Sequence, residues 1–265
     1  MSNVKALELV NISLQYSESR EPTLKNINLS VNQGEVAVIY GHNGSGKSTL
    51  LNVIGNRIYS KNPLHNNITI TGDIFIGGEK VEKNFPYEKI SYSSQHREGA
   101  DFHRVIGELS NNGQVPEEKI NEITDFFRCR SLLKKRMISL SGGQRQLVYI
   151  MKVFLSPNSD IIMLDEPINN LDRTRAVMLN NYIIDFIKRN PTKAIIIVTH
   201  CRMFSNVTPY NLDRGVLTPL PKDMNCTTCF GETDKDGYYE IGEGGEFHEN
   251  EKSGFLNGLK AIFFS

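Results

Sequence analysis

Hydrophobic residues near the start of the chain alternate with polar ones. Ile27, Leu29 and Val31 are separated by single polar residues, which is the period-2 pattern of a strand with one buried face. Leu7 and Leu9 show the same alternation and predict an earlier strand. Strands with one apolar and one polar face are typical of antiparallel sheets. We therefore expect the chain to begin with an antiparallel β segment.

From residue 35 onward the predicted strands change character. Three short, continuous apolar runs occupy residues 36–40, 161–164 and 194–198. Runs without polar gaps are typical of parallel strands that are covered on both faces, as in α/β proteins. Each run ends in a cluster of polar residues, and the carboxyl ends of the strands are where an open α/β sheet binds its ligand. The pattern predicts an α/β fold with its functional site at that edge.

The region between residues 95 and 158 lacks such strands. Helical patterns at residues 116–127 and 142–155 predict a helical subdomain inserted into the sheet domain. After Pro219 the composition shifts to Gly, Glu, Asp and Lys, which predicts a partly disordered C-terminal extension. The expected divisions are a catalytic core at 1–95 and 158–220, a helical subdomain at 96–157 and an extension at 221–265.

Residues 41–48 fit the pattern G-x-x-x-x-G-K-S/T, between a predicted strand and a helix predicted at residues 48–56. In such a loop, backbone N–H groups surround phosphate oxygens and the helix N-terminus adds partial positive charge. Lys47 is expected to neutralise the β- and γ-phosphates of ATP, and the Ser48 hydroxyl to bind Mg²⁺. The residues expected to contact the nucleotide here are Gly41, Asn43, Gly44, Ser45, Gly46, Lys47, Ser48 and Thr49.

Two carboxylates follow the apolar run at residues 161–164, in the Walker B arrangement. Asp165 is expected to hold Mg²⁺. Glu166 is expected to orient or deprotonate the attacking water, a task that needs a carboxylate within hydrogen-bond reach. Two acids at a strand end are often only a solvated turn, but a phosphate loop in the same predicted sheet favours the catalytic interpretation.

Composition and charge limit the class of protein, its partners and its cellular compartment. The 265 residues are 39% hydrophobic and 23% charged, as in an ordinary globular protein. Lys+Arg and Asp+Glu balance at 30 each, so the overall charge favours neither nucleic acid nor an anionic membrane. The apolar runs are far shorter than the about 20 residues that cross a bilayer. With no secretion signal at the N-terminus and four scattered cysteines, we expect a cytosolic chain with reduced thiols.

A further motif, Leu-Ser-Gly-Gly-Gln at residues 140–144, matches the LSGGQ signature of ATP-binding-cassette (ABC) ATPases. The chain resembles this family over about residues 5–205. The resemblance implies an α/β P-loop NTPase sheet with an N-terminal antiparallel β segment and an inserted helical subdomain, and it implies ATP and Mg²⁺ as cofactors. The signature residues that it assigns to the nucleotide are Ser141, Gly142, Gly143 and Gln144.

The resemblance also implies roles for four residues elsewhere. Gln95 is similar to the glutamine that bridges Mg²⁺ and the lytic water, and His200 to the switch histidine at the γ-phosphate. Tyr16 is similar to the aromatic residue that stacks on adenine, and Asp172 to the acid of the D-loop. The implied catalytic set is Glu166, His200 and Gln95, and the implied metal set is Ser48, Gln95 and Asp165.

Some of these residues also have plainer interpretations. A histidine at a strand end, such as His200, is often structural, and an exposed tyrosine such as Tyr16 is common. Ser141 precedes a predicted helix, where its hydroxyl and the N–H groups form an anion site or only an N-cap.

The family fold places the signature far from the phosphate loop of the same chain, so that a second cassette completes each ATP site. Both half-sites are present here, which implies a head-to-tail homodimer with two equivalent sites. The leading hypothesis is the ATPase subunit of a transporter, with separate membrane-spanning subunits docked near Gln95. Such a chain is cytoplasmic and peripheral on the inner face of a membrane, and no stable nucleic-acid partner is expected.

Two other functions compete with this hypothesis. One is a soluble ABC ATPase that powers assembly, repair or defence without a translocation pathway. The other is an ATP-binding switch that does not hydrolyse. The sequence has no long coiled-coil insertion and no second cassette, which disfavours the nucleic-acid versions of the first. Glu166 and His200 together disfavour the second.

Three further features of the sequence each have more than one interpretation. The basic residues 134–136 form either a solvated face or a contact to phosphate backbone. Cys226 and Cys229 resemble half of a zinc site, without a second pair at suitable spacing. Residues 254–265 predict an amphipathic helix whose apolar stripe packs on its own domain, on a partner or on a membrane.

Overall fold

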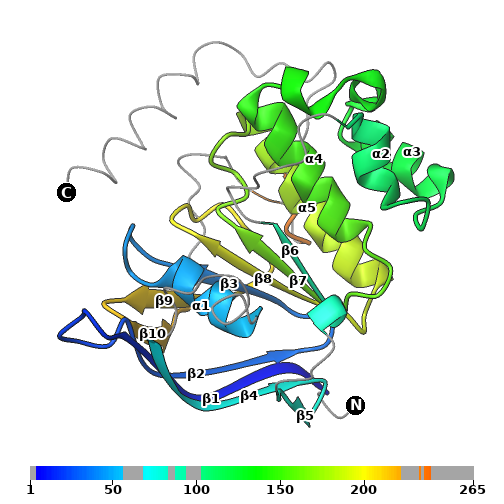
Figure 1. The fold of residues 1–265 in the computed structure, drawn as a ribbon. Helices are drawn as coiled ribbons and strands as arrows, with labels where there is room; N and C mark the ends of the chain where they lie inside the picture. The colour runs from blue at the N-terminus through cyan, green and yellow to red at the C-terminus, as the bar shows by residue number, and fades with distance from the viewer. Residues whose placement is uncertain are drawn as a thin grey trace.

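Two β-sheets organise the protein (Figure 1). The computed structural model describes residues 4–55, 68–82, 87–93, 103–221, 233 and 236–239. Within them, the antiparallel sheet has the order β2-β1-β4-β5 and the larger sheet the order β10-β9-β3-β8-β7-β6. The strands of the first sheet are β1 (Lys5–Tyr16), β2 (Leu24–Asn32), β4 (Ile68–Ile76) and β5 (Glu79–Lys80). Those of the second are β3 (Val36–Tyr40), β6 (Ile90–Ser93), β7 (Ile161–Asp165), β8 (Ala194–Thr199), β9 (Thr208–Asp213) and β10 (Val216–Pro219).

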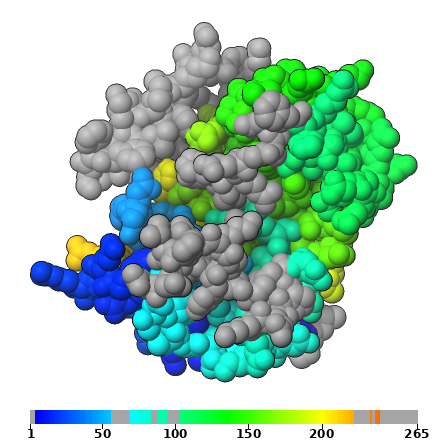
Figure 2. All heavy atoms as spheres, viewed as in Figure 1, coloured from blue at the N-terminus to red at the C-terminus, as the bar shows by residue number. Residues whose placement is uncertain are grey.

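The helices gather mainly on one side of the larger sheet (Figure 1). The α-helices are α1 (Lys47–Ile54), α2 (Val105–Ser110), α3 (Glu117–Phe126), α4 (Gly142–Phe154) and α5 (Arg173–Arg189). Short 3-10 turns are η2 (Tyr87–Lys89), η3 (Arg130–Lys134) and η4 (Met137–Ser139). In the space-filling view the green helical segments and the blue and cyan strands form opposite sides of the molecule (Figure 2).

The continuous apolar strands are buried on both faces, as their pattern predicts. Along β3, Val36, Val38 and Tyr40 belong to one apolar cluster, and Ala37 and Ile39 belong to the other. The alternation follows from the period-2 geometry of a strand, which sends successive side chains to opposite faces. One cluster includes the helical side of the sheet, and the other includes α1 and the antiparallel sheet. A polar residue within such a strand would be buried on either face.

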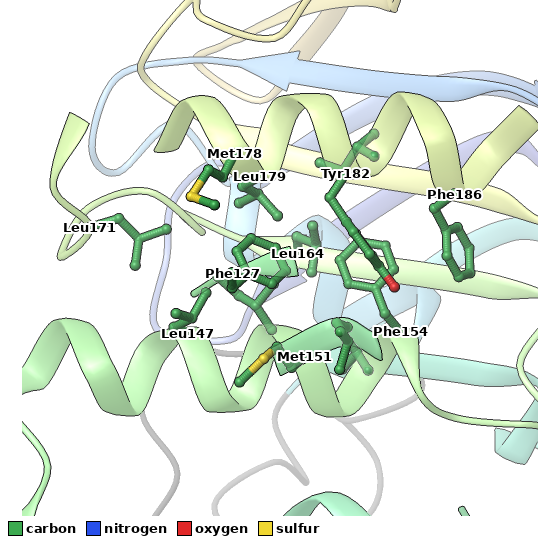
Figure 3. Close-up of a cluster of buried hydrophobic side chains, with 14 of the residues drawn as sticks. Phe127, Leu147, Met151, Phe154, Leu164, Leu171, Met178, Leu179, Tyr182 and Phe186 are labelled. Atoms are coloured by element: carbon green, nitrogen blue, oxygen red, sulfur yellow. The ribbon is translucent and has the colours of Figure 1, made fainter. Parts of the chain in front are cut away.

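Aromatic side chains join α5 to α4 and to the end of α3 (Figure 3). The ring of Phe154 lies 5.0 Å from that of Tyr182 and 4.9 Å from that of Phe186, between centroids, both in edge-on arrangements. Phe127 is 1% exposed and packs against Tyr182 with centroids 5.3 Å apart. Each fully buried side chain of this size contributes about 1.5–3 kcal/mol. This packing fixes the signature helix α4 against the sheet domain through α5.

The predicted elements are present where the structure describes the chain. The three apolar runs are β3, β7 and β8, which are mutually parallel, and the helical patterns are α3 and α4. The sequence did not predict β9, β10 or the packing of residues 236–239 against the core. No helix within the described residues is long and apolar enough to span a membrane. Cys226, Cys229 and residues 254–265 lie outside the described part of the chain.

Candidate active site

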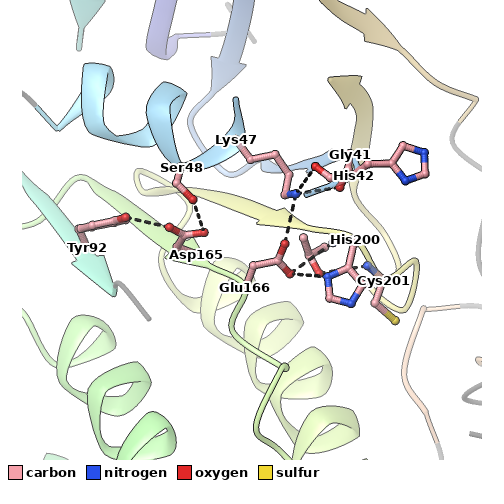
Figure 4. Close-up of polar contacts among 10 residues, drawn as sticks. Gly41, His42, Lys47, Ser48, Tyr92, Asp165, Glu166, His200 and Cys201 are labelled. Carbon is pink, nitrogen blue, oxygen red and sulfur yellow. Dashed lines mark hydrogen bonds and ion pairs between the residues drawn. The ribbon is translucent and has the colours of Figure 1, made fainter. Parts of the chain in front are cut away.

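The strand order brings three polar segments to one edge of the larger sheet. In the order β3-β8-β7, Tyr40 pairs with Thr199 and Val198 pairs with Asp165. The strands are parallel, so the segments that follow them leave from the same edge. The phosphate loop, His200 and Glu166 therefore converge, although they are far apart in the sequence (Figure 4).

The phosphate loop adopts backbone conformations that require glycine. Gly46 is the N-cap of α1 and has φ 105°, which is unfavourable for residues with a side chain. A Cβ on Gly41 would lie 2.4 Å from the backbone oxygen of Leu212 and 2.6 Å from Ser45 Oγ. The loop is therefore closely packed against the end of β9, and its Ser45 hydroxyl is buried without a partner among the described residues.

Lys47 points into the loop from the first turn of α1 (Figure 4). Its ammonium group donates hydrogen bonds to the backbone oxygens of Gly41, at 2.7 Å, and His42, at 3.1 Å. It also lies 3.3 Å from Glu166 Oε1, and both side chains are more than nine-tenths buried. A buried cation needs such compensation, because removal from water is costly. The positive charge is thus held between the loop backbone and the carboxylate at the end of β7.

Two hydroxyl groups contact the Asp165 carboxylate. It accepts hydrogen bonds from Ser48 Oγ, at 3.3 Å, and from the Tyr92 hydroxyl, at 3.0 Å. Burial raises the pKa of Asp165, although the hydrogen bonds from Tyr92 and Ser48 act in the opposite direction. A carboxylate beside a serine hydroxyl is a donor set that suits Mg²⁺, which prefers oxygen ligands. These residues fit the ion that the sequence assigned to them.

Glu166 sits in a left-handed backbone conformation with φ 46° at the strand end. Its Oε2 accepts a hydrogen bond from the backbone N–H of His200 at 3.3 Å and lies 3.0 Å from His200 Nδ1. Burial raises the pKa of Glu166, but the hydrogen bond and charge of His200 and the charge of Lys47 outweigh it, and the net pKa is lowered. A strained conformation and a shifted pKa together are common at functional sites.

The signature residues lie at the exposed start of α4 and not among these groups. Ser141 is the N-cap: its Oγ accepts from the Gln144 backbone N–H at 3.3 Å, and Gln144 Oε1 accepts from the Ser141 backbone N–H at 3.2 Å. This capping box gives both residues a structural role. A Cβ on Gly143 would lie 2.2 Å from the Asn170 oxygen, whereas one on Gly142 would meet nothing within 4 Å.

Asp172 and Tyr16, two further residues predicted from the sequence, lie at the boundaries of secondary-structure elements. Asp172 is the N-cap of α5 and accepts a hydrogen bond from the Arg175 backbone N–H at 2.8 Å. Tyr16 is the half-buried last residue of β1, and the turn after it leads to Thr23, whose oxygen lies beside Gly46. Gln95 lies outside the described residues.

Sequence reasoning missed Tyr92. Its hydroxyl contacts Asp165 because β6 pairs with β7 and Tyr92 is opposite Met163, two residues before the aspartate. In the sequence, Tyr92 is one more apolar residue of a short strand. The available signal was the position of this tyrosine, three residues before Gln95. The alternation of apolar and polar residues does not distinguish it from its neighbours.

Comparison with known proteins identifies the family of the chain. The family model described as ABC transporter matches residues 24–169. The molybdenum import ATP-binding protein ModC of Vibrio parahaemolyticus is 30% identical over 72% of this chain and 51% of its own length. The lipoprotein-releasing system ATP-binding protein LolD of Hahella chejuensis is 28% identical over 82% of this chain and 96% of its own length.

The fold is also that of solved cassettes. A dimeric ATP-binding cassette, MJ0796, in a post-hydrolysis state with ADP and Pi, superposes with a TM-score of 0.65 at 24% identity, covering 81% of this chain and 99% of the other. Several curated relatives are much longer, and the chain spans 35% to 51% of the length of three of them. The match to the family model extends from β2 through the phosphate loop, the signature and β7. The chain therefore belongs to the ABC transporter family, as an ATP-binding cassette.

Proposed function

We propose that this chain hydrolyses ATP and that the hydrolysis drives conformational change in separate membrane-spanning subunits of a transporter. The observation that carries the proposal is the convergence of Lys47, Asp165, Glu166 and His200 at one sheet edge. A cation, a metal-binding carboxylate and a second carboxylate of lowered pKa are the groups that phosphoryl transfer to water requires.

Each residue of this cluster takes a defined role in the proposal. The loop N–H groups and Lys47 bind the β- and γ-phosphates, and Lys47 then exchanges its contact with Glu166 for the phosphates. Ser48 and Asp165 hold Mg²⁺, with Gln95 as a further ligand; the ion supplies positive charge that offsets the phosphate oxygens. Glu166 receives the proton of the attacking water, and His200 orients that carboxylate.

The signature acts on the nucleotide of a second copy of the chain. Ser141 and Gly142 are exposed at a helix N-terminus, which attracts anions, and Gly142 faces open space. A head-to-tail homodimer places this terminus against the γ-phosphate bound by the other copy. The existence of a dimeric cassette with the same fold supports this assembly. Tyr16 stacks on the adenine, and Asp172 lies at the interface of the two chains.

The names of the relatives support the proposed membrane partners. ModC and LolD are named for an import and a lipoprotein-releasing system, and both are ATP-binding proteins of such systems. By the same logic this chain lies on the cytoplasmic face of a membrane, attached to spanning subunits. In this proposal the catalytic core comprises residues 1–95 and 158–220, the membrane subunits dock on the helical subdomain at 96–157, and residues 221–265 form an extension.

A soluble ABC ATPase without a translocation pathway is the alternative. The gene neighbourhood and a reconstitution distinguish the two. A multi-span membrane protein encoded beside this chain should copurify with it and change its ATP turnover by several-fold in lipid nanodiscs. An ATPase that turns over fully without lipid, and whose gene neighbours encode no membrane protein, supports the alternative. No phosphate release by the purified chain with ATP and Mg²⁺, alone or with that membrane protein, contradicts both.

A further inference from the structure

A short segment near the end of the chain packs against α5 (residues 236–239, orange in Figure 1). The Asn181 side chain donates to the Tyr239 backbone oxygen at 2.8 Å and accepts from the Tyr239 backbone N–H at 3.0 Å. One amide side chain thus satisfies both backbone groups of Tyr239, as a neighbouring strand would. We call residues 236–239 the strap.

A second asparagine joins the strap to the segment that follows His200. Asn180 donates to the Gly237 oxygen at 3.2 Å, and its own side-chain oxygen accepts from the Ser205 backbone N–H at 3.0 Å. The Ser205 hydroxyl also donates to the Gly237 oxygen. Gly237 has φ 88°, and a Cβ there would lie 3.1 Å from Ser205 Oγ. The strap and the segment around Ser205 are therefore closely packed at Gly237.

Tyr239 completes the link. It is 4% exposed, and its hydroxyl donates to the backbone oxygen of Met203 at 2.6 Å. Its ring belongs to the same apolar cluster as Met203, Phe204 and Tyr40, the residue that precedes the phosphate loop. The strap therefore contacts the polypeptide only a few residues after His200.

These contacts are buried, which makes them energetically significant. Asn180 is 1% exposed, Asn181 is 8% and Ser205 is 3%. Buried amides are costly unless they are hydrogen-bonded, and a fully satisfied buried network specifies one arrangement. Residues 201–207 contain neither helix nor strand, so their backbone groups depend on such partners. Tyr239 of the strap provides such a partner for Met203, and Asn180 of α5 provides one for Ser205.

We infer that Tyr239, held in place by Asn180 and Asn181, is a positioning residue for His200. Tyr239 of the strap binds the Met203 oxygen, and Asn180 of α5 binds the Ser205 N–H. Together they limit where the chain can run after β8 and so keep His200 Nδ1 beside Glu166 Oε2. The inference rests on the proposed ATPase function, in which His200 orients the Glu166 carboxylate.

The neighbouring tyrosine offers a matched control. The Tyr238 hydroxyl donates to Asp185 Oδ1 at 2.7 Å and accepts from Lys188 Nζ at 3.1 Å, both on the last turns of α5. Replacing either tyrosine by phenylalanine removes one hydroxyl and keeps the ring. The Tyr239 hydroxyl contacts Met203, whereas these two contacts of the Tyr238 hydroxyl are with α5.

The test compares Tyr239→Phe with Tyr238→Phe in the full chain. Tyr239→Phe should lower kcat for ATP by about three- to tenfold, because one hydrogen bond that positions the site is lost, with KM nearly unchanged. The melting temperature should fall by a few degrees, because the buried Met203 oxygen loses this hydrogen bond. Hydrogen–deuterium exchange of amides 201–205 should accelerate in the same variant. Tyr238→Phe should change neither kcat nor the exchange of that segment.

A double-mutant cycle tests whether the effect passes through His200. In a His200→Ala background, Tyr239→Phe should have no further effect on kcat. An additive effect, an equal loss of kcat in both tyrosine variants, or a large change in KM overturns the positioning role. If the wild-type chain hydrolyses no ATP, the proposed function fails instead, whereas normal wild-type turnover with an unchanged Tyr239→Phe overturns this inference alone.

Discussion

The two parts of the proposed ATP site differ in how their polar groups are satisfied. At the carboxyl edge of the larger sheet, Lys47 and Glu166 are buried and already in contact with one another, and Asp165 accepts two hydrogen bonds. At the start of α4, Ser141 and Gly142 are exposed. The hydrogen bonds of Ser141 are local: it shares a capping box with Gln144, and its backbone oxygen accepts from the Arg145 N–H at 2.9 Å.

The difference teaches that one half-site is organised within the chain and the other is not. Buried charges need partners at all times, so the proposed catalytic edge is preformed. The free N–H groups of an exposed helix N-terminus are hydrogen-bonded by water and by the capping residue. They remain available to bind an anion on another molecule. The predictions below test this contrast between a self-contained half-site and one that acts in trans.

The largest effect is expected at the catalytic edge. Glu166→Gln should lower turnover by about 10²–10⁴-fold, because the attacking water loses its carboxylate while the phosphate contacts remain. ATP and Mg²⁺ should still bind and should trap a stable dimer, which gel filtration would detect. A variant that stays monomeric with ATP would count against both the role of Glu166 and the sandwiched dimer.

A smaller effect, on binding, is expected for Lys47→Ala. The substitution removes the buried ammonium group from the phosphate loop, and the loss of charge-assisted hydrogen bonds should weaken ATP binding by about 10- to 100-fold. Isothermal titration measures this directly. Wild-type affinity would show that the loop around Lys47 does not hold the phosphates.

Mixing two inactive chains sharpens the comparison. Ser141→Arg spoils the signature and Lys47→Ala spoils the phosphate loop, so a heterodimer of the two retains at most one composite site. An equimolar mixture should regain about a quarter of wild-type activity, since half of the dimers are mixed and each has half of its sites intact. If the mixture forms dimers but stays inactive, the signature does not act on the nucleotide of the other chain. Activity that is strictly first order in enzyme, with no dimer detectable, would contradict the same claim.

The smallest effect is expected for the end of the chain. Deleting residues 254–265 removes neither half-site, so basal ATP turnover should stay within about twofold of wild type. Attachment to a partner, or the dimer itself, should weaken if the predicted amphipathic helix docks there. A truncated protein that is folded and dimeric but inactive would place these residues in the catalytic machinery.

Much of the fold was readable from local patterns. The runs that became β3, β7 and β8 were visible because strands covered on both faces must be continuously apolar. The phosphate loop was visible because its geometry demands glycine at fixed positions, as the φ of Gly46 illustrates. By contrast, β9 and β10 carry mixed patterns that do not distinguish a strand from a loop.

The sequence by itself determined which chemical groups are present and in what order: a phosphate loop, two carboxylates, a signature and a histidine. Only the tertiary structure decided which of them meet. The strand order β3-β8-β7 brings Lys47, Glu166 and His200 together. Parallel pairing also places Tyr92 on Asp165, and two buried asparagines seat Tyr239 on Met203. These contacts join residues that are distant in sequence, so the local pattern of apolar and polar residues does not predict them. The physical reason is that a hydrogen bond across the core depends on how the elements pack, and not on the residues that flank its donor and acceptor.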